Sequence, residues 1–392
     1  MADRLRIGLV GQGRWGHKLL NALVTLPGVQ LCALCDSRLG DSKWGDSKLG
    51  PQDEGRAGLA EGVPASARIF SSAQQMFRAT ALDAVLIATP SDTHAGLALL
   101  ALEHGLHVFV EKPLALEVQD ARAVVRAAHE RQRVLMVGHI LHHDAAVSIA
   151  YGLLHAGAIG PLRLFLSARC NAVSSSPATQ SRDAREAWWQ LAPHDLAVCS
   201  RAFGHDPHWV QVHSAGERGS SAQATLGYGD GVARLLVGYE TQRVRRLAWI
   251  GDEGALLLQE DVQGAQLRQA RLSQQRCESW LADGARLSQA ELWALVDRSM
   301  TTSTRIEIPN ADALRGELSH FVYCATHGER PISDGAEGLS VVQALAAGDR
   351  ALACGRRQRL EQDASLLIAS TSRAEAGVDE RGHADRAFES EA

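Results

Sequence analysis

The sequence predicts an α/β fold of two domains: an N-terminal Rossmann domain on a doubly wound parallel sheet, and a C-terminal α+β domain on a mostly antiparallel open sheet. At 392 residues the chain exceeds one ordinary domain. Strand-like and helix-like segments alternate over the first 140 residues, which is typical of a parallel sheet with crossover helices. Beyond them come longer segments of period two joined by glycine turns, which favour antiparallel pairing.

Hydrophobic periodicity and turn residues place the individual elements. In the first domain we expect strands at 5–10, 31–35, 68–70, 84–88, 107–110 and 134–137, helices at 14–26, 92–104 and 117–132, and a polar surface insert at 41–66. In the second domain we expect a strand at 162–169 and helices at 145–156, 313–326 and 338–353. The predicted domains are therefore 1–140 and 141–371, followed by a disordered charged tail at 372–392.

Composition narrows the class of protein. The chain is 45% hydrophobic and 22% charged with a net charge of −5, which is ordinary for a globular protein and gives no sign of nucleic-acid binding. Since neither a membrane-spanning run nor a secretory signal is evident, we expect a cytoplasmic protein without a membrane partner. The 7 cysteines are odd in number and scattered, so no disulfide framework is predicted.

The segment Gly11-Gln12-Gly13-Arg14-Trp15-Gly16 has the G-x-G-x-x-G pattern between a predicted strand and a predicted helix. Glycines at these positions permit a tight turn and let backbone N–H groups approach a pyrophosphate at the positive end of the helix. The pattern therefore predicts a dinucleotide site.

Asp36 ends the second predicted strand, 20 residues beyond Gly16. A carboxylate there can accept hydrogen bonds from the hydroxyls of an adenosine ribose and would repel a 2′-phosphate. The sequence thus favours NAD over NADP as cofactor, although the nearby Arg38 weakens that preference.

Several further motifs resemble the Gfo/Idh/MocA oxidoreductase family, which includes glucose-fructose oxidoreductase, inositol dehydrogenases and sugar-nucleotide dehydrogenases. The motifs are Ala88-Thr89-Pro90 with His94, Glu111-Lys112-Pro113, Val137-Gly138-His139, Gly157-x-x-Gly160, Trp189-Gln190-Leu191-Ala192-Pro193-His194-Asp195 and Asp334-Gly335-x-Glu337-Gly338. The segment around His194 looks closest to the sugar-nucleotide 3-dehydrogenase branch.

The resemblance implies a nicotinamide-dependent oxidoreductase that acts on a secondary alcohol or ketone of a sugar, cyclitol or sugar nucleotide. Lys112 would polarise the substrate oxygen or relay its proton, His194 would be the general base, and Pro113 would follow a cis peptide bond. Asp195 is interpreted as structural, and a homodimer or homotetramer is implied. The predicted cofactor-binding residues are Gly11, Gln12, Gly13, Arg14, Trp15, Asp36, Arg38, Thr89, Pro90, His94, Glu111 and Lys112, and the predicted catalytic residues are Lys112, His194 and Gln190.

Two departures from the family pattern keep other functions open. Gln190 stands four residues before His194, where the family usually has Asp, and an amide cannot take a proton. His142 and His143 follow His139, and with Asp144 they form a possible metal set that no second cluster completes, so no metal is predicted. The alternatives are an atypical redox or lyase-type enzyme with bound NAD, and a non-catalytic NAD-binding protein.

Overall fold

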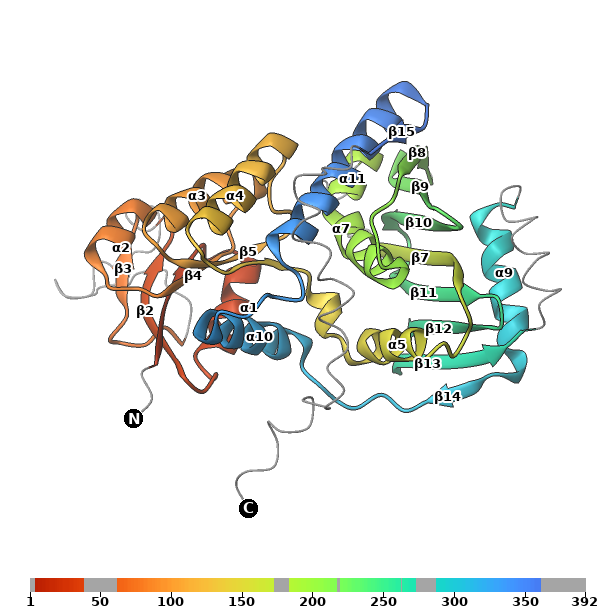
Figure 1. Ribbon diagram of the computed structural model, residues 1–392, viewed down its shortest axis with the longest axis horizontal. Coiled ribbons are helices and arrows are strands. Elements are labelled where there is room, and N and C mark those ends of the chain that lie inside the picture. Colours follow the sequence, from red (N-terminus) through yellow and green to blue (C-terminus); the bar gives the residue numbers. More distant parts are fainter. Residues whose placement is uncertain are drawn as a thin grey trace, which may run out of the picture.

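The computed structural model describes residues 4–38, 62–172, 183–216, 219–261, 263–272 and 287–360. Within them, one sheet of six strands and one of nine lie next to each other with helices between them (Figure 1). This arrangement confirms the predicted fold class. Most of the polar insert and the whole charged tail lie outside the described residues.

The six-stranded sheet has the order of a dinucleotide-binding fold. Its strands run β3 (Arg68–Phe70), β2 (Val29–Cys35), β1 (Leu5–Val10), β4 (Ala84–Ile87), β5 (His107–Glu111) and β6 (Leu135–Gly138), and every pair is parallel. The order reverses between β1 and β4. Ligands of open α/β sheets bind in the crevice outside the carboxyl ends of the strands at such a reversal.

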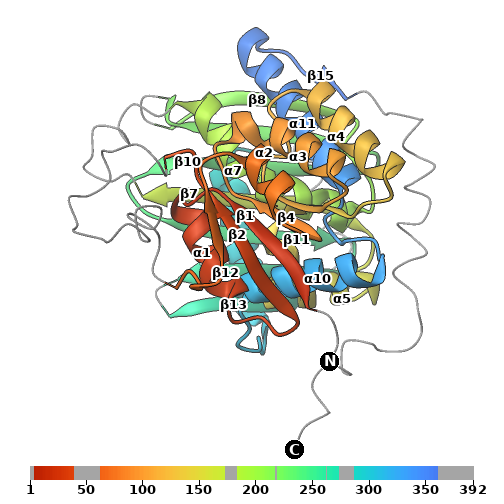
Figure 2. The ribbon, with the colours of Figure 1, turned by 90° about the vertical axis from the view of Figure 1, so that its left-hand side faces the viewer.

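Helices cover both faces of this sheet, as Figure 2 shows from the side of the first domain. One core lies under α1 (Arg14–Leu23) and α10 (Ala313–His327), and the other lies under α2 (Ala73–Ala79), α3 (His94–Glu103) and α4 (Val118–Glu130). Helix α2 was not predicted from the sequence because it is only 7 residues long, although its N-cap Ser72 accepts from the backbone of Gln75.

The position of α10 differs from a simple succession of domains. It follows the second sheet in sequence, yet its Leu318, Phe321 and Cys324 belong to the core of the first sheet. The ring of Phe321 packs against Phe109 of β5 with centroids 5.7 Å apart. The apolar face of the late helix therefore completes the first domain, while the boundaries at 140 and 371 stay a prediction.

The nine-stranded sheet is mostly antiparallel, with β10 and β7 as the parallel pair. Its order is β14 (Thr304–Ile306), β13 (Gly264–Arg271), β12 (Gly254–Asp261), β11 (Val244–Gly251), β7 (Leu162–Ala172), β10 (Gly231–Glu240), β9 (Ser221–Tyr228), β8 (Trp209–Ala215) and β15 (Gln358–Arg359).

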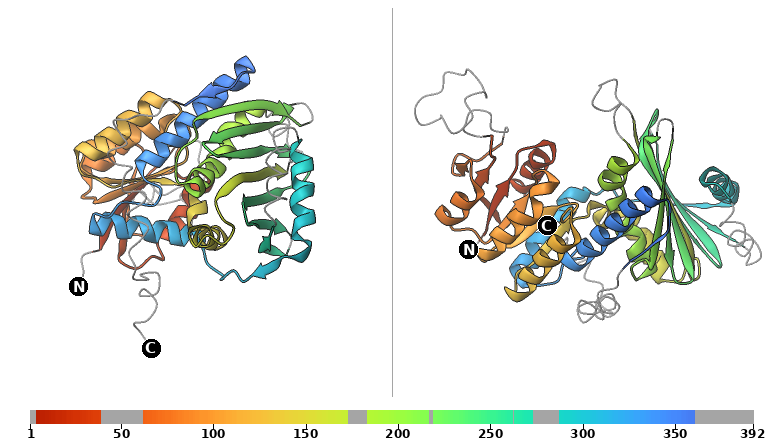
Figure 3. Two further views of the ribbon diagram at one scale, coloured as in Figure 1. Left: turned by 45° about the vertical axis from the view of Figure 1, so that its right-hand side comes forward. Right: turned by 90° about the horizontal axis from the view of Figure 1, so that it is seen from above.

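Three helices pack on the face of this sheet that is turned toward the first domain: α5 (Ala145–His155), α7 (Ala184–Phe203) and α11 (Gly335–Cys354). Figure 3 shows α7 and α11 between the two sheets. Helix α11 contributes Leu339 and Val342 to the core of the first domain and Val341 and Leu345 to that of the second, so it joins the two.

The opposite face of the sheet is partly covered by α9 (Gln289–Ser299), with Leu292, Trp293 and Val296 in the core between them. This helix was missed, although Ser288 and Glu291 form a capping box that the sequence displays. A homodimer or homotetramer stays a prediction. Among the described helices, none combines the length and apolar character needed to cross a bilayer.

Candidate functional site

Steric contact explains two glycines of the phosphate loop. Gly11 has a φ of +100°, and a Cβ atom there would lie 2.4 Å from the carbonyl oxygen of Ala88. A Cβ atom at Gly16 would lie 2.1 Å from the carbonyl oxygen of Gly11, so no larger residue fits.

The third glycine leaves room for a ligand. Gly13 is exposed, and a Cβ atom there would meet nothing within 4 Å. It is the N-cap of α1, and no side chain caps that helix. Open space beside an uncapped helix N-terminus is what an approaching pyrophosphate requires, so these residues fit a dinucleotide. Arg14 is exposed, and Trp15 lies under the ammonium group of Lys18, 4.4 Å from its ring centroid.

Asp36 closes the far side of this loop. Its carboxylate accepts hydrogen bonds from the backbone N–H of Gln12 at 2.7 Å and from the backbone N–H and both Nε and Nη2 of Arg38 at 2.8–3.0 Å. Burial alone would raise its pKa, but the Arg38 guanidinium and the two amides outweigh burial and lower the pKa of Asp36 to about 2. The carboxylate is therefore ionised and its charge is paired with Arg38.

Thr89, Pro90 and His94 form the loop after β4. The methyl group of Thr89 lies beside Gly11, and Pro90 is exposed at the start of the short helix η1 (Ser91–Thr93). His94 is 1% exposed, and its two ring nitrogens lie 2.8 Å from the carbonyl oxygen of Pro113 and 2.9 Å from that of Thr89. Both ring nitrogens of His94 therefore lie beside carbonyl oxygens of two loops at the crevice, and its contact with the cofactor stays a prediction.

Lys112 follows the carboxyl end of β5, and the peptide bond to Pro113 is cis, as the resemblance implied. Its Nζ donates to the backbone carbonyl oxygen of Gln190 in α7 at 2.8 Å. This contact joins the edge of the first sheet to the second domain. Burial, reinforced by the charge of Arg169 and opposed by that of Glu111, lowers the pKa of Lys112. A lysine with a lowered pKa is suited to exchange a proton.

Glu111 is buried at the end of β5 beside Gly138 of β6. Its carboxylate lies where a Cβ atom at Gly138 would come within 3.2 Å, and it acts electrostatically on Glu317 of α10. Burial raises the pKa of Glu111 to about 7, against the opposing charge of Lys112. A contact between Glu111 and the cofactor stays a prediction.

His194 and Gln190 lie one turn apart on α7, which contains Pro193. The Nδ1 atom of His194 is buried and has no hydrogen-bond partner among the described residues. Burial lowers the pKa of His194, and the neighbouring Lys112, Arg169, His139 and Arg245 lower it further. Its imidazole is therefore neutral and surrounded by cationic groups. The side chain of Gln190 is exposed, and only its backbone carbonyl contacts Lys112.

Asp195 has the structural role that its place next to His194 indicated. It is fully buried, and both its oxygens accept from Arg169 of β7 at 2.9 Å. Trp188 is fully buried too: its Nε1 donates to the carbonyl oxygen of Leu345, and its ring fills the space left by Gly348. Asp195 thus links α7 to β7, and Trp188 links it to α11.

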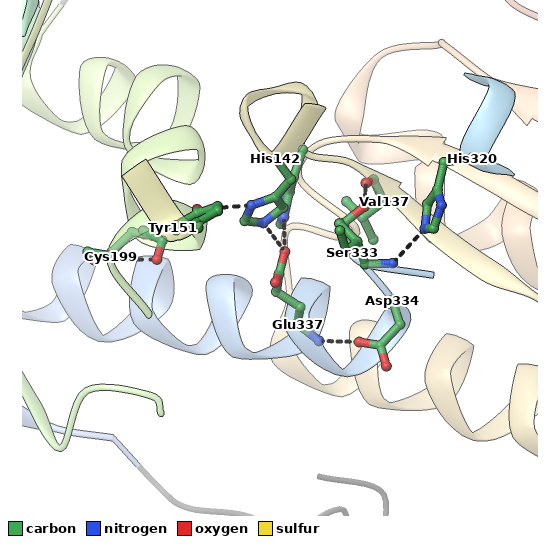
Figure 4. A network of polar contacts seen from close by, with 11 residues as sticks. Val137, His142, Tyr151, Cys199, His320, Ser333, Asp334 and Glu337 are labelled. Carbon is green, nitrogen blue, oxygen red and sulfur yellow. Dashed lines mark hydrogen bonds and ion pairs between the residues drawn. The ribbon is translucent and has the colours of Figure 1, made fainter. Parts of the chain in front are cut away.

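The histidines after β6 form a group that the sequence did not reveal. His139 Nδ1 and His142 Nε2 each lie 2.8 Å from the same oxygen of Glu337 in α11, and the hydroxyl of Tyr151 lies 3.1 Å from His142 Nδ1. Figure 4 shows Tyr151, His142 and Glu337 in this line. All four side chains are buried.

Hydrogen bonding accounts for the arrangement. If Tyr151 donates to His142, and both histidines donate to Glu337, every donor in the group has an acceptor. Among the described residues, His139, His142 and Glu337 are also the one group of His, Cys, Asp or Glu side chains that could hold a metal ion. Their potential ligand atoms all lie within 4.8 Å of one another. His143 and Asp144 lie outside it: His143 packs against His320, and Asp144 caps α5. The absence of a metal stays a prediction.

The comparisons with known proteins agree with this geometry. Residues 5–139 match the family model described as the Gfo/Idh/MocA oxidoreductase family with an NAD-binding Rossmann fold. Residues 5–139 are thus similar to the Gfo/Idh/MocA family. The resemblance drawn from its motifs is thereby confirmed, and so is nicotinamide dinucleotide binding as the property of this fold family; the match does not distinguish NAD from NADP.

Among relatives, an uncharacterized oxidoreductase of Streptococcus pneumoniae is 29% identical over 182 residues, 46% of this chain and 45% of its own length. A 2,7-anhydro-N-acetylneuraminate hydratase of Mediterraneibacter gnavus is 35% identical over 105 residues, 27% of this chain and 28% of its own length. The chain thus spans half or less of these two relatives. A D-apiose dehydrogenase of Paraburkholderia graminis is 26% identical over 387 residues and covers 94% of both chains.

Solved structures of the same fold extend the likeness to the second domain. The aldose-aldose oxidoreductase of Caulobacter crescentus is 20% identical with a TM-score of 0.71, covering 91% of this chain and 100% of its own. The UDP-N-acetylglucosamine 3-dehydrogenase of Acidithiobacillus ferrooxidans is 21% identical with a TM-score of 0.67, covering 89% and 98%. At these identities the likeness concerns the fold.

Proposed function

We propose that the protein is a nicotinamide-dependent oxidoreductase that transfers a hydride between the cofactor and a secondary alcohol or ketone of a sugar, cyclitol or sugar nucleotide. The observation that carries the proposal is the 2.8 Å contact from Lys112 Nζ to Gln190. It brings a lysine at the carboxyl edge of a dinucleotide-binding sheet onto the helix that carries His194. Full-length likeness to a D-apiose dehydrogenase supports a sugar as substrate.

The phosphate loop and Asp36 would hold the cofactor, whose nicotinamide supplies or accepts the hydride when bound. Lys112 would bind the substrate oxygen and exchange its proton, since burial already lowers the cost of losing a proton from Nζ. Neutral His194 would accept a hydrogen bond from the substrate hydroxyl and share in the proton transfer. Gln190, whose side chain is exposed, would hydrogen-bond a neighbouring hydroxyl.

For the cofactor, we propose NAD rather than NADP. The ionised Asp36 supports this choice because a 2′-phosphate beside it would be repelled. Its pairing with Arg38 reduces the repulsion, so the preference is expected to be moderate. Quenching of tryptophan fluorescence by NADH and by NADPH measures both dissociation constants. Tighter binding of NADPH would contradict the proposal.

The decisive test of the activity is turnover. We would mix the full chain with NAD+ and a panel of D-apiose, a free aldose, myo-inositol and UDP-N-acetylglucosamine, and follow the absorbance of NADH. The Lys112→Ala variant is expected to lose at least about 100-fold in kcat with NADH affinity retained. Lys112→Arg keeps the positive charge, but a guanidinium does not release its proton, so kcat should fall by as much as in Lys112→Ala. Full activity in either variant overturns the role of Lys112.

A second candidate is a reaction without net oxidation that uses bound NAD. Two observations favour it: Gln190 replaces a group that could take a proton, and one relative is named a hydratase. It predicts product formation that requires NAD+ but leaves the NADH absorbance unchanged. A non-catalytic NAD-binding protein predicts NADH binding with no product from any member of the panel.

A further inference from the structure

His139 has one ring nitrogen fixed by a carboxylate and the other without a partner. Its Nδ1 lies 2.8 Å from Glu337, and its Nε2 is buried and has no hydrogen-bond partner among the described residues. The residue is 1% exposed. A carboxylate on Nδ1 holds the imidazole in the tautomer whose Nε2 carries a lone pair, and it stabilises the imidazolium that forms when Nε2 takes a proton.

The register of the first sheet places His139 at the same sheet edge as Lys112. Glu111 of β5 is the parallel partner of Gly138 of β6, so Lys112 and His139 are the next residues at the same sheet edge. The charge of Lys112 acts on His139, and His139 in turn acts on His194. Since Nδ1 faces Glu337, Nε2 lies on the opposite side of the ring.

The surroundings of Glu337 keep it ionised. It lies in the first turn of α11, where the helix dipole favours a negative charge, and its backbone N–H donates to Asp334. Although burial opposes ionisation, His142 and His139 lower its pKa. Glu337 is thus a charged partner for His139, whereas the described contacts of His194 include no carboxylate.

We propose that His139, oriented by Glu337, is a second proton acceptor that works behind Lys112. This inference rests on the proposed oxidoreductase function. In alcohol oxidation the C–H bond breaks with its electron pair going to the nicotinamide, the O–H bond breaks, and the C=O bond forms. When Lys112 is deprotonated, the hydroxyl proton passes to its amine, and one N–H proton of the resulting ammonium passes to His139 Nε2. The imidazolium, paired with Glu337, returns its proton to solvent after product release.

The groups that act on His139 come from the elements packed around it: Glu337 from α11, His142 from η2 (Ile140–His143) and Lys112 from the end of β5. Burial has the largest effect and lowers the pKa of His139; Glu337 opposes this lowering, and the charges of His142 and Lys112 add to it. Gln190 adds no charge to this balance. Helix α7 therefore has Gln190 where the family usually has Asp, whereas His139 after β6 has a carboxylate partner in Glu337.

One arm of the test needs no substrate. Histidine nitrogen NMR on the full chain saturated with NAD+ is expected to find His139 neutral at pH 8 with its proton on Nδ1, and the His139→Asn variant assigns the signal. A proton on Nε2 would overturn the proposal. So would one equivalent of bound zinc in elemental analysis, because a metal would then occupy the nitrogens assigned to hydrogen bonds.

The second arm uses whichever sugar of the panel is turned over. His139→Asn keeps an N–H for Glu337 but lacks the base, so kcat should fall on the order of 100-fold while the melting temperature and the KM for NAD+ stay unchanged. Glu337→Gln should move the acidic limb of the kcat–pH profile to lower pH, a shift that a structural role would not produce. The matched control is His143→Asn, a neighbouring histidine whose Nε2 is also unpartnered but which packs on α10; it should keep kcat within about twofold.

The outcomes separate the two proposals. If a sugar is turned over and His139→Asn keeps more than half of the wild-type kcat, the role of His139 is wrong and the oxidoreductase function stands. If no sugar reacts, the proposed function fails, and the NMR arm alone decides whether His139 has the predicted tautomer.

Discussion

Two histidines near Lys112 have different polar partners, although burial and the charge of Lys112 lower the pKa of both. His194, on α7, is acted on by Lys112, Arg169 and Arg245, and its helix has Gln190 one turn earlier. His139, after β6, shares Glu337 with His142. We call these the α7 side and the β6 side. The difference teaches that a histidine's position in a motif does not determine its chemistry; the charges that reach it do.

On the α7 side the carboxylate next to His194 in sequence belongs to Asp195, and it contacts Arg169. Asp195 is fully buried and engages Arg169 with both oxygens, so it neutralises the arginine and leaves His194 without an anion. On the β6 side the carboxylate comes from a distant helix and contacts the imidazoles directly. The following predictions, ordered from the largest expected effect to the smallest, test whether the two sides differ in this way.

Asp195→Asn is expected to have the largest effect on stability. Removing one partner of a buried ion pair leaves the Arg169 charge uncompensated and should lower the free energy of unfolding by about 3–5 kcal/mol. Urea unfolding measures it. The control is Asp349→Asn, which breaks the more exposed Arg185–Asp349 pair and should cost no more than about 1 kcal/mol. Equal losses in the two variants would mean that the buried pair does not hold α7 in place.

Glu337→Leu removes the anion of the β6 side. It leaves two buried imidazole N–H groups without an acceptor, at a cost of roughly 1–3 kcal/mol for each. The same urea experiment measures the loss, with the exposed Glu329→Leu as the control for adding a leucine. A loss no larger than that of the control would show that the histidines do not depend on Glu337.

The pH dependence of stability should respond to His194. Its pKa is lowered in the folded state, so below a pH of about 6.5 the unfolded chain binds a proton that the folded chain does not. The stability contributed by neutral His194 is complete above that pH and is lost as the pH falls, by about 1.4 kcal/mol per pH unit. His194→Gln should flatten the dependence of the unfolding free energy between pH 6.5 and 5 by that slope. An unchanged slope would contradict the cationic environment.

Gln190→Asp should have the smallest effect. It restores a carboxylate one helical turn before His194, and an oppositely charged pair at this spacing stabilises a helix by roughly 0.2–0.5 kcal/mol. Histidine NMR should show the pKa of His194 raised slightly and that of His139 unchanged. A larger rise at His139 than at His194 would mean that the two sides are not electrically separate.

The parts of the site formed by short segments were predictable. Six consecutive residues form the phosphate loop, and the steric need for Gly11 and Gly16 follows from a turn that the pattern specifies. Lys112 at the end of a strand is equally local. Glu337 could not be predicted to contact His139, since the two are 198 residues apart and nothing in either segment specifies the other.

Other differences arose from tertiary packing. The Glu111 carboxylate lies beside Gly138 of the neighbouring strand, a contact that the sequence of β5 alone does not show. The contacts of His94 with the carbonyl oxygens of Thr89 and Pro113 could not be predicted, because these two residues lie in separate loops. Helix α9 is a different case, because the capping box at Ser288 was visible and could have been used.

The return of α10 to the first sheet has a consequence for synthesis of the chain. Leu318 and Phe321 join the same core as Ile7 and Leu9, so this face of the first sheet is covered by α1 but lacks α10 until the ribosome has passed residue 321. At about 5–20 residues per second, the interval after residue 140 is roughly 9–36 s. During that time the apolar surface that α10 later covers is exposed, so a fragment ending at residue 140 is expected to be less stable than the same residues in the full chain.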